Sequence, residues 1–304
     1  MGRAEKEPPR PFARPRCMDA PPQHSAGRSG IAAIAGGVLI GAAAIGILWA
    51  ERAQPLRQPT RPRTRRTIVN LALGAMSMAA VNRIEAPMTQ PLARSAERRR
   101  RGLVQRLPGP DWLRDAAAVL LMDYTVYLWH VATHRVPFLW RFHLVHHDDL
   151  DLDASTAIRF HAVDMAISAP YRAAQVALIG TSPRALQIWQ SWFFFSVLFH
   201  HGNMRLPERI ERILARFVTT PRMHGIHHSA VKEETDSNWS SGFAFWDHLH
   251  GTFRLDVPQE AIAIGVPAYR DPDELGFRDS LALPFVEQRD AWVGAVRADD
   301  ARRR

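Results

Sequence analysis

The chain has 304 residues, of which 46% are hydrophobic and 23% are charged, and its formal net charge is +9. This length allows one large domain or two small ones, and Cys17, the only cysteine, excludes an intrachain disulfide and a thiolate metal site. Residues 1–110 hold 19 Lys and Arg against 6 Asp and Glu, whereas residues 111–304 hold 20 against 24. Because the arginines flank apolar segments, and no nucleic-acid motif or aromatic interleaving accompanies them, a membrane explains the basic part better than nucleic acid does.

Residues 1–29 are rich in Pro and Arg and are expected to form a disordered basic arm. Residues 30–110 are expected to hold transmembrane helices and basic loops. Residues 30–50 carry no charge and have about the length that crosses a bilayer. A signal peptide is the rival interpretation, but the arm before this segment is long and no clear small-residue cleavage site precedes the arginines that follow it. A second uncharged stretch, 67–82, is shorter and could span the bilayer with its flanking arginines at the interface.

The remaining chain predicts a catalytic domain over residues 111–255 and a soluble C-terminal tail over 256–304. Residues 112–134 form the next predicted helix. Two apolar stretches, 162–180 and 185–200, are joined by Thr-Ser-Pro and indicate a helical hairpin that enters and leaves the membrane. Such a hairpin returns the chain to the side it left. Histidines before and after it would then meet on one face of the bilayer, so we expect an all-α, integral-membrane helical bundle with a histidine-rich helical cap.

Thirteen of the fourteen histidines lie between His130 and His250, and eight of them form three spaced clusters. The clusters are His130 and His134 (HxxxH), then His143, His146 and His147 (HxxHH), then His224, His227 and His228 (HxxHH). Positions three and four apart share one helix face, where imidazoles can chelate one ion. Eight imidazoles exceed the needs of one tetrahedral zinc and suit a dinuclear site.

Three further side chains are candidates for the same site. His161 and His201 adjoin the clusters and are expected to complete the metal ligands, His200 less so. Asp123 shares a helix face with His130 and His134, and a carboxylate within an apolar helix is costly unless it is paired. We expect Asp123 to orient a ligating histidine through its second ring nitrogen, and so to serve catalysis. The alternative is a polar helix face that packs against the cap.

Imidazole ligands suit zinc, copper, nickel or iron about equally well. The apolar, membrane-embedded setting favours oxidation of a lipid C–H bond, which requires a redox metal, whereas zinc supports only Lewis-acid or hydrolytic chemistry. The sequence contains neither HExxH nor GxSxG, so a standard metalloprotease or serine hydrolase is unsupported.

Residues 60–285 resemble the sterol desaturase / fatty acid hydroxylase superfamily. The matching segments are Asp123 with Tyr127-Leu-Trp-His130, Leu139-Trp-Arg-Phe-His143-Leu-Val-His146-His147, Arg159-Phe-His161, His201-Gly-Asn203, Thr220-Pro-Arg-Met-His224-Gly-Ile-His227-His228-Ser229, and Asn238 with Trp246-Asp-His-Leu-His-Gly-Thr252. Departures from the family pattern are Ala162, Trp239-Ser240 and His250, and they put the shape of the substrate in doubt more than metal binding.

The resemblance implies two iron ions and O2 as co-substrate, acting in the hydroxylation or desaturation of a sterol, fatty acyl or related lipid. It also implies a separate electron donor (a ferredoxin, a cytochrome b5-like protein or a reductase) and a metal site on the cytoplasmic side. Only Lys6 and Lys232 are lysines among 39 basic residues, which favours a G+C-rich bacterial genome and thus a bacterial inner membrane. Two alternatives stay open: a non-redox, zinc-binding membrane protein, and a catalytically silent member of the family.

Overall fold

The computed structural model describes residues 41–294. The chain divides into two compact units, Met1–Gly41 and Ala42–Arg304, and every element below belongs to the second. The expected arm at 1–29, and the first half of the expected helix at 30–50, lie outside the described residues.

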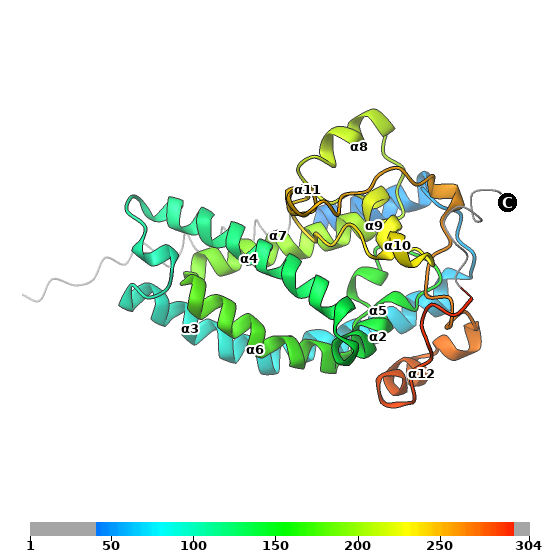
Figure 1. Ribbon diagram of the computed structural model, residues 1–304, viewed down its shortest axis with the longest axis horizontal. Coiled ribbons are helices and arrows are strands. Elements are labelled where there is room, and N and C mark those ends of the chain that lie inside the picture. The colour runs from blue at the N-terminus through cyan, green and yellow to red at the C-terminus, as the bar shows by residue number, and fades with distance from the viewer. Residues whose placement is uncertain (1–40, 295–304) are drawn as a thin grey trace, which may run out of the picture. The chain divides into compact units, whose positions relative to one another are not determined.

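The described part is helical and, apart from three isolated β-bridges, contains no β-structure, which confirms the all-α prediction. Residues 42–53 are helical. The helices that follow are α2 Arg63–Ala80, α3 Ala86–Arg99, α4 Asp111–Arg135, α5 Pro137–His147, α6 Ala162–Ile179, α7 Pro183–His201, α8 Glu208–Leu214, α9 Pro221–His227, α10 Lys232–Thr235, α11 Phe245–His250 and α12 Phe277–Ala282 (Figure 1). A π-turn, Val81–Glu85, joins α2 to α3, and short 3-10 turns lie at Val104–Arg106, Thr156–Ile158, Gln259–Ala261, Pro272–Leu275 and Leu283–Phe285.

The long N-terminal helix differs from the prediction of a span at 67–82 followed by a basic loop. The helix continues through the π-turn and α3 although Pro91 lies inside α3; ten of the fourteen residues at 86–99 are the good helix formers Ala, Arg, Gln, Glu, Leu and Met. It stops where Arg100 adopts a left-handed conformation. The segment Arg63–Arg106, 44 residues that include α2, the π-turn, α3 and the short turn after it, is the one among the described residues with the length and composition to cross a membrane. Membrane spans at the other apolar helices stay a prediction.

Helices α4, α6 and α7 pack into a bundle together with α2 and α3 (Figure 1). Met122 and Val126 of α4 contact Val176 of α6 and Trp189 of α7 in its apolar core. The predicted hairpin at 162–180 and 185–200 is present as α6 and α7. Its turn fits closely against the chain between α3 and α4, since a Cβ on Gly102 would lie 2.2 Å from Gly180 Cα.

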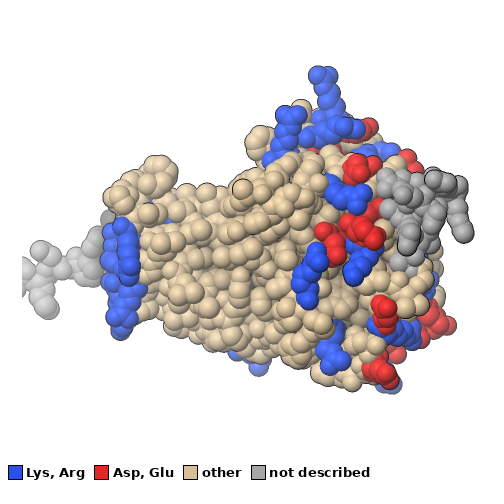
Figure 2. Space-filling view, viewed as in Figure 1, with Lys and Arg blue, Asp and Glu red and all other residues tan. Residues whose placement is uncertain are grey.

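The bundle has an extensive uncharged surface. Figure 2 shows this surface between basic side chains at one end and mixed charges at the other. Several large apolar side chains of α2, α6 and α7 point outward, including Ile68, Leu71, Ile188 and Leu178, the last of which is 74% exposed. Few apolar patches of this extent occur on monomeric soluble proteins, and they mark protein–protein or membrane contacts.

The described C-terminal residues, 256–294, pack onto the charged end of the molecule. Ile264 pairs with Ser229 in a β-bridge, and the buried side chains of Val266 and Tyr269 pack in one cluster with Leu144 of α5. This end of the molecule holds nearly all the histidines, so residues 256–294 help to enclose them.

Candidate metal centre

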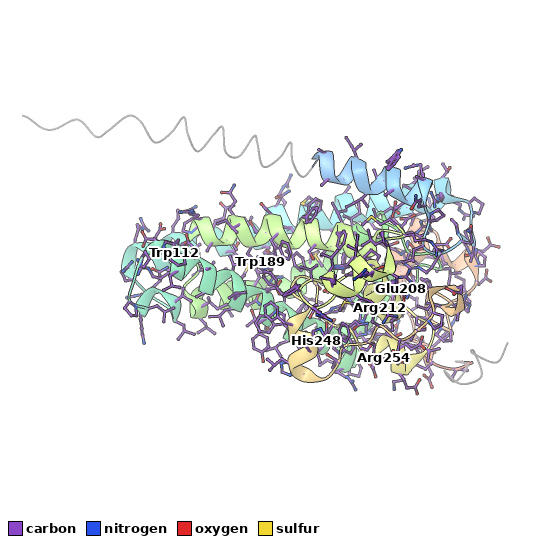
Figure 3. The ribbon with its side chains drawn as sticks, turned by 90° about the horizontal axis from the view of Figure 1, so that it is seen from above. Trp112, Trp189, Glu208, Arg212, His248 and Arg254 are labelled. Atoms are coloured by element: carbon purple, nitrogen blue, oxygen red, sulfur yellow. The ribbon has the colours of Figure 1, made fainter. Side chains whose placement is uncertain are left out.

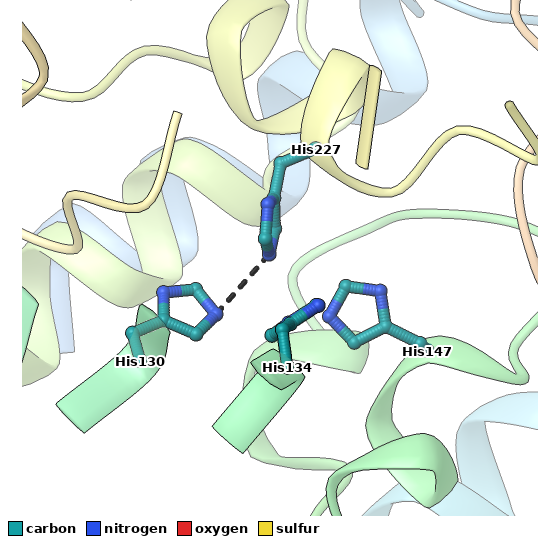
Figure 4. A group of neighbouring side chains, drawn as sticks. All are labelled: His130, His134, His147 and His227. Carbon is teal, nitrogen blue, oxygen red and sulfur yellow. Dashed lines mark hydrogen bonds between the residues drawn. The ribbon is translucent and has the colours of Figure 1, made fainter. Parts of the chain in front are cut away.

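Two groups of four histidines face each other at the charged end of the bundle. The first histidine group is His130, His134, His147 and His227 (Figure 4), and the second histidine group is His146, His201, His224 and His228. Within each group the ring nitrogens that could bind metal lie within 4.8 Å of one another. Seven of these eight side chains are buried, and His134 is partly exposed.

Four helices supply the two groups. His130 and His134 lie one turn apart on α4, and α5 begins at Pro137, directly after α4 ends. Pro137 is at the first position of α5, where its missing N–H costs nothing, and the reversal turns the α5 histidines back toward α4. The hairpin of α6 and α7 then returns the chain, so that His201 at the end of α7 reaches the second group.

Backbone carbonyls fix the protonation of one ring nitrogen in four of the histidines. Nδ1 donates to a carbonyl in each: His130 to Trp239 (2.7 Å), His146 to Arg159 (3.2 Å), His201 to Val197 (2.8 Å) and His227 to Ser237 (2.9 Å). A carbonyl oxygen only accepts, so Nδ1 carries the proton in these rings and Nε2 of the neutral ring presents a lone pair. Hydrogen-bonded second nitrogens of this kind orient metal-binding histidines.

One pair in each group then places two lone pairs face to face. The Nε2 atoms of His130 and His227 are 3.1 Å apart, joined by the dashed line in Figure 4, and those of His146 and His201 are also 3.1 Å apart. Ligand nitrogens around a metal at 2.0–2.1 Å would be separated by about 2.9–3.4 Å, depending on the coordination geometry. The residues therefore fit one metal ion in each group, because a cation turns the repulsion between lone pairs into shared coordination.

Protonation of one ring is the other way to remove this repulsion, and burial opposes it. Removal from water lowers the pKa of His227 to about 3 and holds the pKa of His146 well below its ordinary value, with further lowering from neighbouring histidines. The same causes, burial first, lower the pKa of His147, His224 and His228. The rings are thus neutral at physiological pH, which is the form that binds metal.

His143 lies between the two groups and belongs to neither. Its ring centroid is 5.0 Å from that of His134 and 5.3 Å from that of His146. Nδ1 is 3.5 Å from a carboxylate oxygen of Asp164, and Nε2 is buried without a hydrogen-bond partner. A buried polar atom without a partner is costly, so Nε2 of His143 is a further donor for a bound ion.

The three additional histidines have different surroundings. His201 lies in the second group, as the sequence indicates. His200 also comes close, with its ring 4.0 Å from that of His224. His161, expected among the ligands, instead caps α6, where its Nδ1 accepts a hydrogen bond from Val163 N at 3.1 Å, and its ring contacts Phe142 and Phe285. A helix N-terminus needs such an acceptor, and His161 is in neither of the two histidine groups.

Asp123 differs from the expectation in its partners. Its carboxylate accepts hydrogen bonds from the backbone N–H of Phe243 (3.1 Å) and from Nε1 of Trp246 (2.8 Å). The nearby ligand His130 donates to the Trp239 carbonyl instead. The contacts of Asp123 thus connect α4 to the segment that precedes and begins α11, and the orienting role expected of Asp123 belongs to backbone carbonyls.

Sequence reasoning missed two features that shape the centre. Trp239 is buried against three rings of the first group, with centroid distances of 5.7 Å to His130, 4.7 Å to His134 and 5.2 Å to His227. In the sequence, Trp239 stands out only as a departure from the family pattern. Its position directly after Asn238, which matches that pattern, could have indicated that it lies near the site.

The second missed feature is a buried ion pair behind the second group. Arg159, whose carbonyl binds His146, donates from its guanidinium to Asp148 (2.7 Å), Asn70 (2.9 Å) and Ser280 (3.0 Å). The acidic run that follows His147 was the available signal. Its carboxylates are buried, and those of Asp149, Asp151 and Asp153 bond to the N-terminal part of α2 and the loop before it.

Comparison with protein families matches residues 116–252 to the fatty acid hydroxylase family. The matched segment, somewhat less than half of the chain, is therefore similar to the fatty acid hydroxylase family. The matched residues include both histidine groups in full. No solved structure matches the chain significantly.

Curated relatives with similar sequences are hydroxylases or monooxygenases by name. The chain is 30% identical over 169 residues to the ornithine lipid hydroxylase OlsE of Rhizobium tropici, covering 55% of this chain and 49% of the relative. It is 26% identical over 145 residues to the alkylglycerol monooxygenase of Homo sapiens, covering 46% and 30%. It is 28% identical over 144 residues to a cholesterol 25-hydroxylase-like protein of Danio rerio, covering 46% and 55%. The chain thus spans between about a third and just over half of these relatives' lengths.

Proposed function

We propose that this protein is a membrane-bound di-iron oxidase that uses O2 to hydroxylate a C–H bond of a lipid. The observation that carries the proposal is the pair of opposed Nε2 lone pairs in each of two adjoining histidine groups. All three relatives described above carry names that denote hydroxylation or monooxygenation, so hydroxylation is favoured over desaturation. The lipid belongs to the broad class of sterols, acyl chains and ether lipids.

The eight grouped histidines would hold the two metals, with His143 as a donor between them. A bound redox metal pair would supply the reduction of O2 and the oxidation of the substrate, with electrons from a separate donor protein. A carboxylate-poor, imidazole-rich ligand set is compatible with iron and does not by itself select it over zinc.

The chain's own residues have three tasks in this reaction. Backbone carbonyls hold the rings in the tautomer that directs Nε2 to the metals, as described for His130 and His227. Trp239, which is only 1% exposed, packs against the rings of the first group and fixes their positions. The hydrogen bonds of Asp123 hold the segment that includes Trp246 against the bundle, and so close the side of the site next to α4.

The proposed location is an inner membrane, with the metal centre on the cytoplasmic face. Support comes from the uncharged surface of the bundle and from the 44-residue helix that is apolar enough to span. The return of the chain through α6 and α7 puts the early and late histidines on the same side.

Two measurements test the proposal, one on the purified full chain and one in cells. The metal content should be about two irons per chain after growth with iron. Cells that express the protein should incorporate one atom of ¹⁸O from ¹⁸O2 into a lipid, and cells with His227→Ala should lose the product. A His248→Ala variant is the matched control, because His248 packs on Phe253 away from both groups.

The outcomes also separate the alternatives. Stoichiometric zinc from iron-replete cells, with no labelled lipid, would identify a non-redox metal protein. Full iron loading with no change in any lipid between wild type and His227→Ala would identify a catalytically silent member.

A further inference from the structure

Helix α8 and the turn after it expose a second apolar surface, outside the bundle and apart from the two histidine groups. Ile210 and Ile213 are each 52% exposed, and Phe217 is 61% exposed. The helical pattern of hydrogen bonds continues past α8, from Ala215 N to Glu211 O (2.8 Å) and from Val218 N to Leu214 O (2.9 Å). The three apolar residues, spaced by three and four, therefore share one face.

A basic face lies beside the apolar one. Arg209, Arg212 and Arg216 each directly precede one of the three apolar residues, and all three are exposed. One residue corresponds to a rotation of about 100° around a helix, so the two faces are adjacent. Figure 3 labels Arg212 together with Glu208, its partner one turn earlier at 2.6 Å.

A third face attaches the segment to the protein. Glu211 and Ala215 are fully buried, and Glu211 accepts hydrogen bonds from the backbone N–H and Nε of Arg222 on α9. Segment 209–217 is therefore held in one orientation, with its apolar and basic faces turned outward. A fixed apolar face of this kind on a protein surface requires a partner.

The place of this segment along the bundle identifies the partner. Ala244 N donates to Phe217 O, and the adjoining Phe243 and Trp246 bond to Asp123 of α4. Asp123 is twelve residues before the end of α4, or about 18 Å along the helix. Segment 209–217 thus stands beside the bundle and not beyond its end.

Exposed apolar side chains are also present on α4 and α11, the helices linked to this segment through Asp123 and Ala244. Leu120 and Leu128 of α4 are each 40% exposed, and Leu249 of α11 is 69% exposed. Figure 2 shows basic side chains over α8 at the margin of the uncharged surface, and Figure 3 shows Arg212 beyond Trp189 on the side away from Trp112. Apolar side chains next to arginines, at the edge of a membrane-facing surface, match the headgroup layer of a bilayer.

We propose that segment 209–217 lies in the headgroup region of the cytoplasmic leaflet and binds anionic lipids, with Ile210, Ile213 and Phe217 inserted and the three arginines at the phosphates. This inference rests on the proposed membrane position of the bundle. It does not depend on the metal or on the reaction.

The test uses a fluorescent label on the full chain in lipid vesicles. In a Cys17→Ser background, Ile213→Cys carries a nitrobenzoxadiazole label, and Asp273→Cys, exposed in the C-terminal part, carries the same label as the matched control. Vesicles contain phosphatidylcholine alone or phosphatidylcholine with phosphatidylglycerol, each with or without a spin-labelled lipid quencher.

We expect blue-shifted emission at position 213 and quenching by the lipid quencher that is several-fold stronger than at 273. Phosphatidylglycerol should strengthen the quenching at 213, and the triple change Arg209→Gln/Arg212→Gln/Arg216→Gln should remove that increase. Equal exposure of both labels to aqueous iodide, without lipid quenching in either vesicle, would overturn the proposal. A label at 213 that becomes protected only when an acidic protein is added would also overturn it and identify a protein partner.

A carbonate extraction of the same vesicles keeps this result separate from the proposed function. If the chain resists extraction while the label at 213 stays in water, the segment proposal fails and the integral-membrane proposal stands. If the chain is extracted, the membrane position of the bundle fails first.

Discussion

The Nε2 atoms of His130 and His227 are 3.1 Å apart. The Nδ1 atoms of both rings donate to carbonyls of the same short segment, those of Trp239 and Ser237. The two ligands come from helices α4 and α9, 97 positions apart in the chain. Segment 237–239 therefore sets the spacing of the first histidine group by holding both rings at once.

Loss of one ligand should empty one group before the other. His227→Ala should leave roughly half of the metal, because the second group keeps all four of its histidines, and it should abolish lipid oxidation. His161→Ala should keep both ions, because His161 caps α6. Metal per chain, measured by plasma mass spectrometry on purified protein, checks both. Equal metal loss in the two variants would return His161 to the ligand set.

Gly225, between the ligands His224 and His227, has no room for a side chain. A Cβ there would lie 2.2 Å from Nη1 of Arg57 and 2.9 Å from Oε1 of Gln259. Gly225→Ala should therefore displace α9 or Arg57, at a cost of about 1–3 kcal/mol, and reduce metal content. Thermal unfolding and metal analysis of the purified variant measure the two effects.

A second variant tests whether Gly225→Ala loses metal because its side chain clashes with Arg57. Arg57→Ala/Gly225→Ala should recover part of the metal that Gly225→Ala loses, because the clashing guanidinium is gone. If the double variant binds less metal than either single variant, crowding against Arg57 is not the cause.

Arg159 should be more sensitive than its distance from the metals suggests. Arg159→Met leaves the buried carboxylate of Asp148 without its cation, and breaking such a pair typically costs about 3–5 kcal/mol. The carbonyl that orients His146 belongs to Arg159 itself, so the second histidine group should lose metal first. Arg159→Lys keeps the charge and should lie between wild type and Arg159→Met in both thermal stability and metal content.

Substitutions at Asp123 test what this carboxylate does. Asp123→Asn keeps an oxygen that can accept from Trp246, and it should lower activity only modestly. Asp123→Leu removes the acceptor for both Phe243 N and Trp246 Nε1, at about 1–3 kcal/mol for each donor left buried and unpaired. Neither variant should lose metal. A loss of metal in Asp123→Asn equal to that in His227→Ala would support the direct role in the histidine cluster that the sequence indicates.

The histidine spacing in the sequence was sufficient to find the groups but not to divide them. Positions such as 143, 146 and 147 share a helix face, which predicts that they bind metal together. In the structure His147 joins the first group, His146 joins the second, and His143 lies between them. The division depends on which helix faces each side of α5, and local periodicity contains no information on that.

Other features of the centre depend on contacts between residues far apart in the chain, and the sequence alone does not show which residues are in contact. The carbonyls of Trp239 and Ser237 reach rings on α4 and α9, and any residue type could supply a carbonyl. His161 has the same chemistry as the ligands, and only the position of α6 explains its use as a cap. The continuation of the N-terminal helix through 86–99 was predictable from composition, but the arginine run indicated a loop.

The dependence of the first group on segment 237–239 has a consequence for biosynthesis. Translation proceeds at about 5–20 residues per second, and the carbonyls that orient His130 and His227 are made well after α4, α6 and α7. In the proposed membrane arrangement, the bundle would therefore be made and inserted before the centre can take up its ions. If the proposed function holds, a cell short of metal would accumulate chains that still await loading, so the supply of metal and not the rate of synthesis would set the amount of active protein.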